Sequence, residues 1–90
     1  MRHRSYIDIM GVILNAANER RGIRKSRMMY KTFVGHAQLK EYLPALIENG
    51  LLHHDRDAQT FKTSQKGLRF LNSYNLLYET MKNTPTPIQQ

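Results

Sequence analysis

The spacing of apolar residues restricts the fold of this chain more than any other feature of its sequence. Apolar side chains recur every three or four residues, as they do along one face of an α-helix, in three long segments: 5–20, 36–49 and 64–82. Two short runs without this period, 51–55 and 60–63, lie between the last two segments. The pattern therefore predicts a mostly helical chain with one β-hairpin before its last helix.

Capping residues indicate where the first helices begin and end. Ser5 and Asp8 have the spacing of a capping box, and Gly22 is expected to close the first helix. Residues 23–25 then form a short link with the length of a brief strand. Ser26 is expected to cap a short second helix over residues 27–31.

The third helix is expected to follow a tight turn at residues 32–35. It extends from His36 to Asn49, where the asparagine and the glycine after it are a strong stop signal. Pro44 lies inside this helix and cannot donate a hydrogen bond to the carbonyl of Lys40, which costs about 3 kcal/mol in a straight helix. The sequence therefore predicts either a kink at Pro44 or a shorter regular helix.

The two short runs are predicted to be the strands of a β-hairpin. The residues between them, 56–59, are polar and typical of a turn. Ser64 is then expected to cap the last helix, which ends before Pro85 because a residue that precedes proline disfavours helical dihedral angles. Residues 84–90 are expected to form a flexible tail.

The resulting order is helix, link, helix, turn, helix, hairpin, helix, which is that of a winged helix-turn-helix domain. This is a mostly helical α+β fold in which two helices joined by a tight turn precede a hairpin, the wing. We expect residues 1–83 to form one such domain, with the last helix (about 64–82) serving for dimerisation. A chain of 90 residues has room for one modest core, so association of two copies would add stability.

The charge of the chain favours a polyanionic partner. Lys and Arg number 14 against 7 Asp and Glu, and the formal net charge is +7. Six of these cations lie between residues 20 and 31, beside the predicted helix-turn-helix. Since the second helix of such a pair fits the major groove and the wing reaches an adjacent backbone, double-stranded DNA is the predicted partner. The expected DNA contacts are Arg24, Lys25, Arg27, Lys31, His36, Gln38, Lys40 and Arg56.

Other classes of protein find little support in the sequence. Cysteine is absent, which excludes disulfides and Cys-based zinc sites and favours a cytoplasmic location. No apolar segment has the length of a membrane span, and the basic start of the chain is not followed by a signal-peptide pattern. No catalytic motif nominates an enzyme, and no cofactor or small-molecule ligand is expected. His53 and His54 are neighbours on a strand, so they would point to opposite faces and not share one metal ion.

Four stretches of the chain resemble a known archaeal family: RMMYK (27–31), QLKEYL (38–43), ENGLL (48–52) and FKTSQKGLRFL (61–71). This is the ArnR-like winged helix-turn-helix family, which includes the ten-kilodalton archaeal chromatin proteins with a coiled-coil tail. The resemblance extends from Ser5 to Met81. It implies DNA binding without catalysis, and dimers formed through the last helix. The chain departs from the family pattern at Gly35, where a serine usually caps the third helix, at Pro44, and in its short last helix.

The last predicted helix carries an apolar stripe that extends beyond the core that a domain of this size needs. Its later members are expected to form a homodimer interface: Phe70, Tyr74, Leu77, Tyr78 and Met81. The alternative is that this helix folds back on the first helix of the same chain. If the protein binds DNA as a dimer, we expect it to be a transcription regulator or an architectural chromatin protein associated with the nucleoid.

Two other functions are compatible with the same pattern. A winged-helix domain can serve as a protein-interaction scaffold, because fold does not dictate function. RNA binding is a weaker alternative, since no recognisable base-stacking module is present. Tyr30 and Tyr42 could stack on single-stranded bases, but such tyrosines are more often half-buried with the hydroxyl outward, and Tyr42 lies on the buried stripe of its helix.

Overall fold

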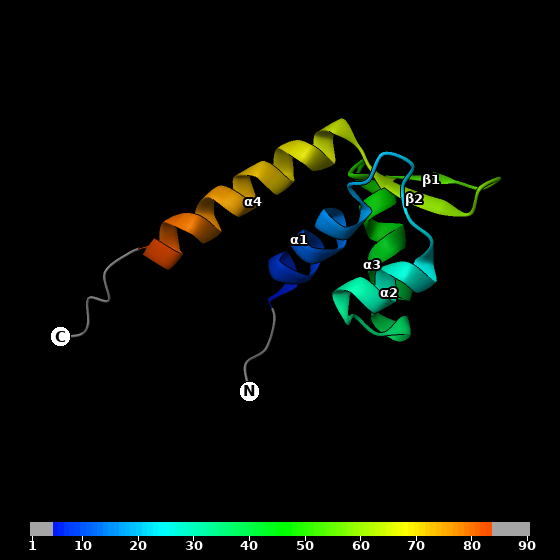
Figure 1. Ribbon diagram of the computed structural model, residues 1–90, viewed down its shortest axis with the longest axis horizontal. Helices are drawn as coiled ribbons and strands as arrows, with labels where there is room; N and C mark the ends of the chain where they lie inside the picture. The colour runs from blue at the N-terminus through cyan, green and yellow to red at the C-terminus, as the bar shows by residue number, and fades with distance from the viewer. Residues whose placement is uncertain (1–4, 84–90) are drawn as a thin grey trace.

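The computed structural model describes residues 5–83, which form four helices and one two-stranded antiparallel sheet (Figure 1). The elements follow one another as α1 (Tyr6–Ala17), α2 (Lys25–Thr32), α3 (His36–Glu48), β1 (Leu52–Asp55), β2 (Thr60–Thr63) and α4 (Gln65–Asn83). The predicted order of helices and hairpin is confirmed, and with it the α+β winged-helix architecture. The tail predicted at residues 84–90 lies outside the described residues.

Helix α1 begins as predicted and ends earlier. The hydroxyl of Ser5 accepts a hydrogen bond from the backbone N–H of Asp8 at 3.1 Å, and the Asp8 carboxylate accepts one from the N–H of Ser5 at 3.4 Å. These two bonds complete the expected capping box. The helix ends at Ala17, with Asn18 as its C-cap residue, so the prediction that Gly22 closes it is wrong.

The loop after α1 brings the chain against the hairpin. Gly22 has a φ of 75°, and a Cβ atom there would lie 2.6 Å from the carbonyl oxygen of Phe61. Ile23 then pairs with Phe61 through two backbone hydrogen bonds of 2.9 and 2.8 Å, so the predicted link is a strand at this residue alone. This bridge holds the backbone extended as far as Arg24, which is the N-cap residue of α2, and the prediction of Ser26 in that role is wrong.

Thr32 holds the turn between α2 and α3. Its hydroxyl donates to the carbonyl of Met28 at 2.8 Å and accepts from the N–H of Val34 at 3.1 Å. Phe33 lies between them in the left-handed conformation, with a φ of 60° and a side chain that is 88% exposed. The predicted turn is confirmed, with a phenylalanine where the conformation favours glycine.

Helix α3 continues through its proline. It is helical from His36 to Glu48, so it is not cut short at Pro44. Gly35 precedes it as the N-cap residue and provides no side-chain hydrogen bond. At the other end the carbonyl of Ala45 accepts both the backbone N–H of Asn49 at 3.0 Å and its side-chain amide at 2.7 Å, which fixes the C-cap residue on the last turn.

The strands β1 and β2 pair so that His53 lies opposite Lys62 and His54 opposite Phe61. Because side chains alternate between the two faces of a strand, the first pair and the second pair occupy opposite faces of the hairpin. The face with His54 and Phe61 is turned toward α3. The predicted hairpin is confirmed, with β1 beginning one residue later, at Leu52.

Helix α4 begins close to the start of the hairpin. The hydroxyl of Ser64 accepts from the N–H of Gly67 at 2.9 Å and donates to the carbonyl of Gly50 at 2.6 Å, which confirms Ser64 as the residue that caps the helix. At Gly67 the helix approaches the hairpin so closely that a Cβ atom would lie 2.2 Å from the carbonyl oxygen of Leu51. A glycine is therefore needed at this contact.

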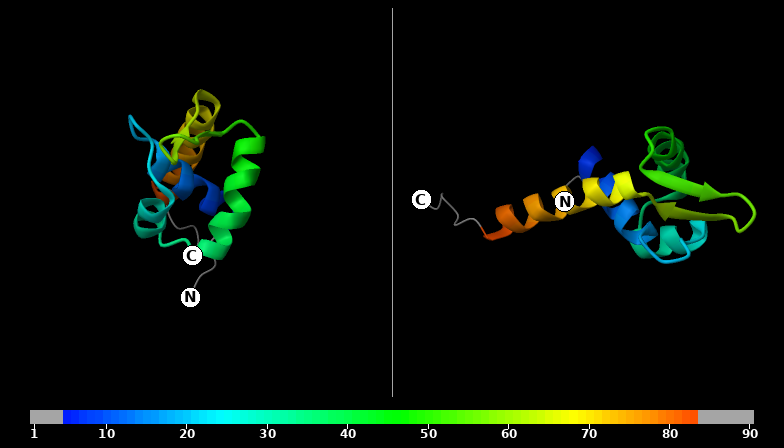
Figure 2. Two further views of the ribbon diagram at one scale, coloured as in Figure 1. Left: turned by 90° about the vertical axis from the view of Figure 1, so that its right-hand side faces the viewer. Right: turned by 90° about the horizontal axis from the view of Figure 1, so that it is seen from above.

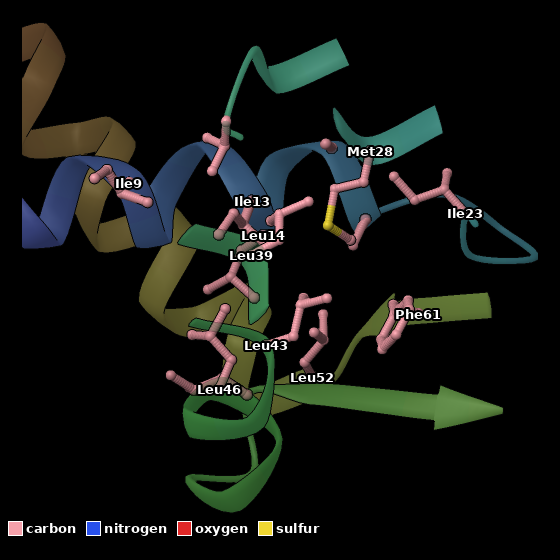
Figure 3. Close-up of a cluster of buried hydrophobic side chains, with 14 of the residues drawn as sticks. Ile9, Ile13, Leu14, Ile23, Met28, Leu39, Leu43, Leu46, Leu52 and Phe61 are labelled. Atoms are coloured by element: carbon pink, nitrogen blue, oxygen red, sulfur yellow. The ribbon is translucent and has the colours of Figure 1, made fainter. Parts of the chain in front are cut away.

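A single hydrophobic core connects the first three helices with the hairpin (Figure 3). Its most deeply buried large side chains come from α1, α2, α3 and β1: Ile13, Leu14, Met28, Leu39, Leu46 and Leu52. Among the described side chains of α4, those of its first part contribute, up to the buried Leu71 and the partly buried Tyr74. The rest of α4 extends away from the core.

The molecule is elongated, with extents of 54 × 28 × 20 Å. The free end of α4 lies at one end and the tip of the hairpin at the other (Figures 1 and 2). Within residues 5–83 no helix combines the length and the apolar character that crossing a bilayer would require.

Candidate nucleic-acid interface

Three elements meet at the end of the molecule that is remote from the free end of α4: α3, α2 and the hairpin (Figure 2). Helix α3 is the second helix of the helix-turn-helix pair, the element that enters the major groove in domains of this kind. The side chains that these elements present decide what the surface can bind.

The solvent face of α3 is not basic. Ala37, Glu41, Pro44 and Glu48 are exposed at spacings of three and four residues, on the side opposite to the buried leucines of the helix. Glu41 and Pro44 therefore occupy the middle of the helix face that would enter a major groove, and Glu48 lies at its C-terminal end. Cationic contacts to phosphates must come from the edges of α3 and from the other elements.

The three predicted contacts on α3 are all exposed, but they lie on different sides of the helix. His36 and Gln38 belong to its first turn. Residues two apart on an α-helix are separated by about 200°, so Gln38 and Lys40 flank the solvent face on opposite sides. Lys40 is on the side of the hairpin, where it borders a groove.

The structure brings Lys25 and Lys40 together. Both border the groove between α3 and the hairpin, although they come from different helices. Lys25 is the first residue of α2, and the preceding Arg24 makes no capping hydrogen bond through its exposed side chain. The positive end of α2 therefore lies beside two ammonium groups. These two predicted contacts therefore face one groove, although they come from different helices.

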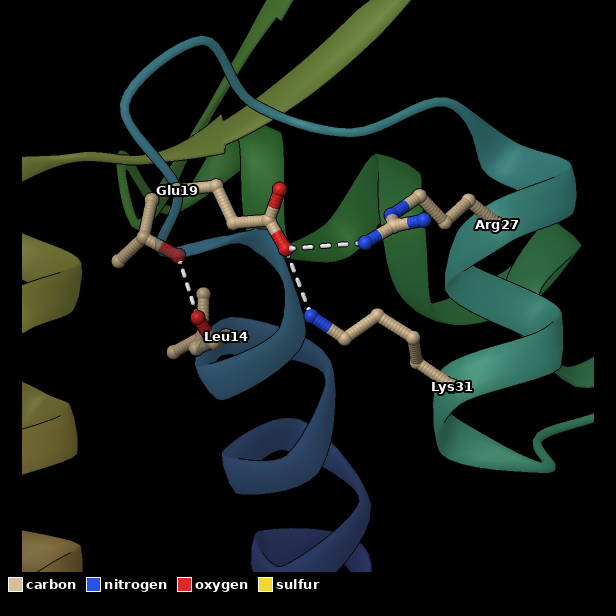
Figure 4. Close-up of polar contacts among 5 residues, drawn as sticks. Leu14, Glu19, Arg27 and Lys31 are labelled. Carbon is tan, nitrogen blue, oxygen red and sulfur yellow. Dashed lines mark hydrogen bonds and ion pairs between the residues drawn. The ribbon is translucent and has the colours of Figure 1, made fainter.

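Arg27 and Lys31 are engaged with an acidic residue. The ammonium of Lys31 lies 2.6 Å from the carboxylate of Glu19, and the guanidinium of Arg27 lies 3.9 Å from it (Figure 4). The hydrogen bond from Lys31, and to a smaller degree the charge of Arg27, hold the pKa of Glu19 below its ordinary value. Glu19 thus offsets part of the positive charge of these two predicted DNA contacts.

Arg56 lies in the loop that joins the two strands, and its side chain is exposed. The loop backbone is held by Asp55, whose carboxylate accepts from the N–H groups of Asp57 and Ala58 at 3.0 and 3.1 Å. The side-chain amide of Gln59 donates to the carbonyl of Arg56 at 2.7 Å. The loop is therefore ordered by its own side chains, and Arg56 is available to a partner.

A second basic surface was not assigned from the sequence. Arg20 and Arg21 lie with His53, Lys62 and one acidic residue, Asp55, around a hollow of about 470 Å³ on the face of the hairpin that is turned away from α3. The ammonium of Lys62 donates to the carbonyl of Arg20 at 2.6 Å. The strand alternation already places His53 and Lys62 on one face, but their proximity to the arginines depends on the loop after α1.

The two adjacent histidines point to opposite faces of the hairpin, as predicted. The ring of His54 stacks on the ring of Phe61, with centroids 4.3 Å apart and planes 4° apart. His53 borders the basic hollow on the other face. In the described part of the chain, no three potential metal ligands cluster together.

The two tyrosines near the interface differ in exposure. Tyr42 is partly buried and lies 5.2 Å from the ring of Tyr6, as measured between centroids. Desolvation, with a further contribution from Tyr6, raises its pKa. The side chain packs against the core from its edge and is not one of the buried core residues that the sequence predicted it to be. Tyr30 is 81% exposed, contrary to the expected half-burial, because Met28 and Thr32 occupy the buried side of α2.

The residues predicted for a dimer interface form two groups along α4. Phe70 and Tyr74 are partly buried against the core of their own chain. The remaining three are between 57% and 73% exposed: Leu77, Tyr78 and Met81. These three continue the same apolar stripe and border a groove between α4 and the start of α1. No partner chain is needed to explain the first group. The second group is largely exposed, although the ring of Tyr78 stacks with that of Tyr74 at 6.5 Å between centroids.

A family model described as winged helix-turn-helix matches residues 3–82, so the chain belongs to this winged helix-turn-helix family. Domains of this fold are typically DNA-binding modules and not enzymes. No curated protein shows a significant match to the sequence.

Proposed function

We propose that this protein binds double-stranded DNA through α3, the N-terminus of α2 and the hairpin. The observation that supports the proposal most directly is the convergence of Lys25 and Lys40 beside the groove between α3 and the hairpin. Arg24 and Arg56 add exposed cations from α2 and from the hairpin loop. Cations from three separate elements can follow a phosphate backbone and release its counterions.

Within this proposal the predicted contacts have different roles. His36 and Gln38, in the first turn of α3, are placed to reach base edges, and Gln can pair with adenine through two hydrogen bonds. The cations on α2, on α3 and on the wing hold the backbone and set the register. Arg27 and Lys31 contribute less, because they share the negative charge of Glu19.

We further propose that the protein is a transcription regulator or an architectural chromatin protein of the archaeal ArnR-like branch, acting at the nucleoid in the cytoplasm. The four stretches that resemble this branch support the assignment. The acidic solvent face of α3 favours the architectural role. Phosphate contacts from the flanking elements give affinity that is independent of sequence, whereas two glutamates on the helix face add none.

The active form in this proposal is a homodimer that pairs through α4. The exposed stripe of Leu77, Tyr78 and Met81 has the spacing of a helix–helix contact and lies beyond the core of its own chain. Two-fold pairing through α4 would place two copies of α3 at a fixed separation, which would set the spacing of contacts on DNA.

The test is binding to a labelled random duplex, measured by fluorescence anisotropy across a salt series. The double variant Lys25→Gln/Lys40→Gln removes two charges at the interface. Its matched control, Lys66→Gln/Arg69→Gln, removes two charges from α4. For the wild type we expect log affinity to fall with log salt by about 0.9 for each phosphate contacted, and for the interface variant we expect that slope to be smaller by about 2.

The outcomes separate DNA binding from its main alternative, a protein-interaction scaffold. A loss of affinity and of slope in the interface variant, with the α4 control unchanged, supports the proposal. If the wild type does not bind DNA even at low salt, the proposal is wrong. The scaffold function would then be favoured, with the exposed stripe on α4 as its contact surface.

A further inference from the structure

A groove of about 450 Å³ separates α3 from the hairpin. Its α3 wall carries Pro44 and Ile47, and its hairpin wall carries His54. Its floor reaches Leu43 and Phe61, which belong to the buried core and come from α3 and β2 (Figure 3). The groove therefore opens on the proposed DNA-binding face and extends down to the core.

The apolar lining of this groove is unusual for a surface that contacts DNA. Protein–DNA interfaces are polar and strongly positive, so phosphate contacts do not account for an apolar groove. Aliphatic and aromatic side chains with a few polar groups are instead typical of pockets for small molecules. The exposed ring of His54, which stacks on the buried ring of Phe61 with centroids 4.3 Å apart, provides a flat aromatic wall against which a planar group can lie.

The charged groups at the rim favour an anion. Lys25 and Lys40 border the groove with two ammonium groups, and Glu48 borders it with one carboxylate. Helix α2 begins at Lys25 without a side-chain cap, so its positive end adds to the two ammonium groups. The balance at the rim is therefore positive, above an apolar interior.

Pro44 leaves a backbone carbonyl of α3 without its usual helical donor. Proline has no N–H group, so it cannot donate to the carbonyl of Lys40 one turn earlier in the helix. Both residues border the groove. A hydroxyl or amide group of a ligand could donate to this carbonyl, since a backbone carbonyl has two acceptor positions.

We propose that this groove binds a small amphipathic organic anion, such as an aromatic carboxylate. Its apolar part lies on Pro44, Ile47 and the aromatic wall, and its anionic group lies between Lys25 and Lys40. No small-molecule ligand was expected from the sequence, because the groove is assembled from α2, α3 and the hairpin. The regulatory consequence rests on the proposed function: a ligand that occupies these ammonium groups takes them from the phosphates and weakens DNA binding.

The proposal is tested with the full chain and 8-anilinonaphthalene-1-sulfonate, a planar aromatic anion whose fluorescence rises in apolar surroundings. A fluorescence titration gives its apparent Kd, and chemical-shift changes in NMR spectra locate the site. We expect saturable binding, with the largest shifts at Ile47, His54 and Phe61. The exposed stripe on α4 can also attract the probe, so the titration is repeated with Leu77→Asn, which should leave binding at the groove unchanged.

Four substitutions distinguish the groove from non-specific attraction. Lys40→Gln should raise the apparent Kd about tenfold, which corresponds to the loss of one charge-assisted hydrogen bond. Arg69→Gln removes the same charge from α4 and should have no effect. Glu48→Gln removes the acidic group at the rim and should tighten binding, whereas Ile47→Asn should weaken it. Circular dichroism confirms that each variant is folded.

The titrations of the wild type and of the four variants together decide whether the groove binds the probe. Weaker binding in Lys40→Gln and Ile47→Asn, with Arg69→Gln unchanged, supports the proposal. The absence of saturable binding, or shifts confined to α4, overturns it. A parallel titration with duplex DNA separates the two proposals. If the protein binds the probe in the groove but does not bind DNA, only the proposed function is refuted. If it binds DNA but not the probe, only the ligand site is refuted. Where both bind, the probe should displace the duplex.

Discussion

At residue scale, Phe33 is strained without any gain from burial. It adopts a φ of 60° and is 88% exposed, so no packing in the chain compensates for a conformation that favours glycine. We expect Phe33→Gly to raise the free energy of unfolding by about 1 kcal/mol, because glycine adopts this conformation without strain. Urea denaturation measures the change.

The control is Tyr30→Gly, because Tyr30 is a similarly exposed aromatic residue inside α2. This substitution should lower the free energy of unfolding by about 1 kcal/mol. Equal effects of both variants would contradict the strain at Phe33.

Glu19 makes the free energy of unfolding depend on pH in the acidic range. Its pKa is lowered from 4.5, mainly by the hydrogen bond from Lys31. A group with a lowered pKa in the folded state stabilises the fold above its unfolded pKa, and this contribution is lost as the pH falls through the lower, folded value. We therefore expect the Glu19 carboxyl to titrate below 4.5 in an NMR experiment. Lys31→Gln should move the midpoint upward, and the control Lys62→Gln should not; a midpoint that is the same in both variants would refute the assignment.

At the scale of elements, the sequence was sufficient for features that depend on local signals. The capping box at Ser5, the cap at Ser64 and the four-residue hairpin loop depend on neighbours in sequence, and the structure confirms them. The start of α2 depends instead on the distant pairing of Ile23 with Phe61, which no local signal reveals. The candidate site is divided in the same way. The exposure of its cations was predictable from the sequence. The approach of Lys25 on α2 to the groove beside Lys40 on α3, and of Arg20 and Arg21 to the hairpin, depends on tertiary packing.

The contact between α4 and the hairpin depends on the absence of a side chain at Gly67. A Cβ atom at this position would lie 2.2 Å from the carbonyl oxygen of Leu51. Alanine favours helices over glycine by about 1 kcal/mol, but here we expect Gly67→Ala to lower the free energy of unfolding by about 2 kcal/mol, because backbone must move. Gly35→Ala is the control, since a Cβ atom there would meet nothing within 4 Å. Urea denaturation should show a much smaller change for it; a neutral Gly67→Ala would refute the close contact.

The acidic solvent face of α3 has a consequence for DNA affinity. Glu41 lies in the middle of this exposed face, where its charge would repel phosphates on either side of a major groove. We expect Glu41→Gln to tighten binding to a random duplex severalfold at low salt, and less so at high salt because of screening. Fluorescence anisotropy measures the change. Glu79→Gln on α4 is the control with the same change of charge, and an equal gain in both variants would show that only net charge matters.

At the scale of the whole molecule, the two ends of the elongated fold have different chemistry. One end carries α3, the hairpin and the cations that border their groove, and the other carries an exposed apolar stripe on α4. Figure 1 shows how far apart these elements lie. In the proposed dimer, this separation would allow one end to bind DNA while the other end pairs with a second copy, without competition between the two surfaces. It also means that loss of association should reduce DNA affinity indirectly, by reducing the number of linked binding sites.

The homodimer contact proposed for α4 can be tested by comparing substitutions on opposite sides of the helix. Leu77 lies on the stripe that continues from the core contacts of α4, whereas Leu76 is one residue earlier and points away from that stripe, and the two are 63% and 69% exposed. We expect Leu77→Asn to convert a dimer into a monomer and Leu76→Asn to leave it intact, because only the first removes apolar area from the proposed interface. Analytical ultracentrifugation of the full chain measures the mass in each case. A wild-type protein that sediments as a monomer at all concentrations, or equal effects of the two substitutions, would rule out this interface and leave the stripe to a different partner.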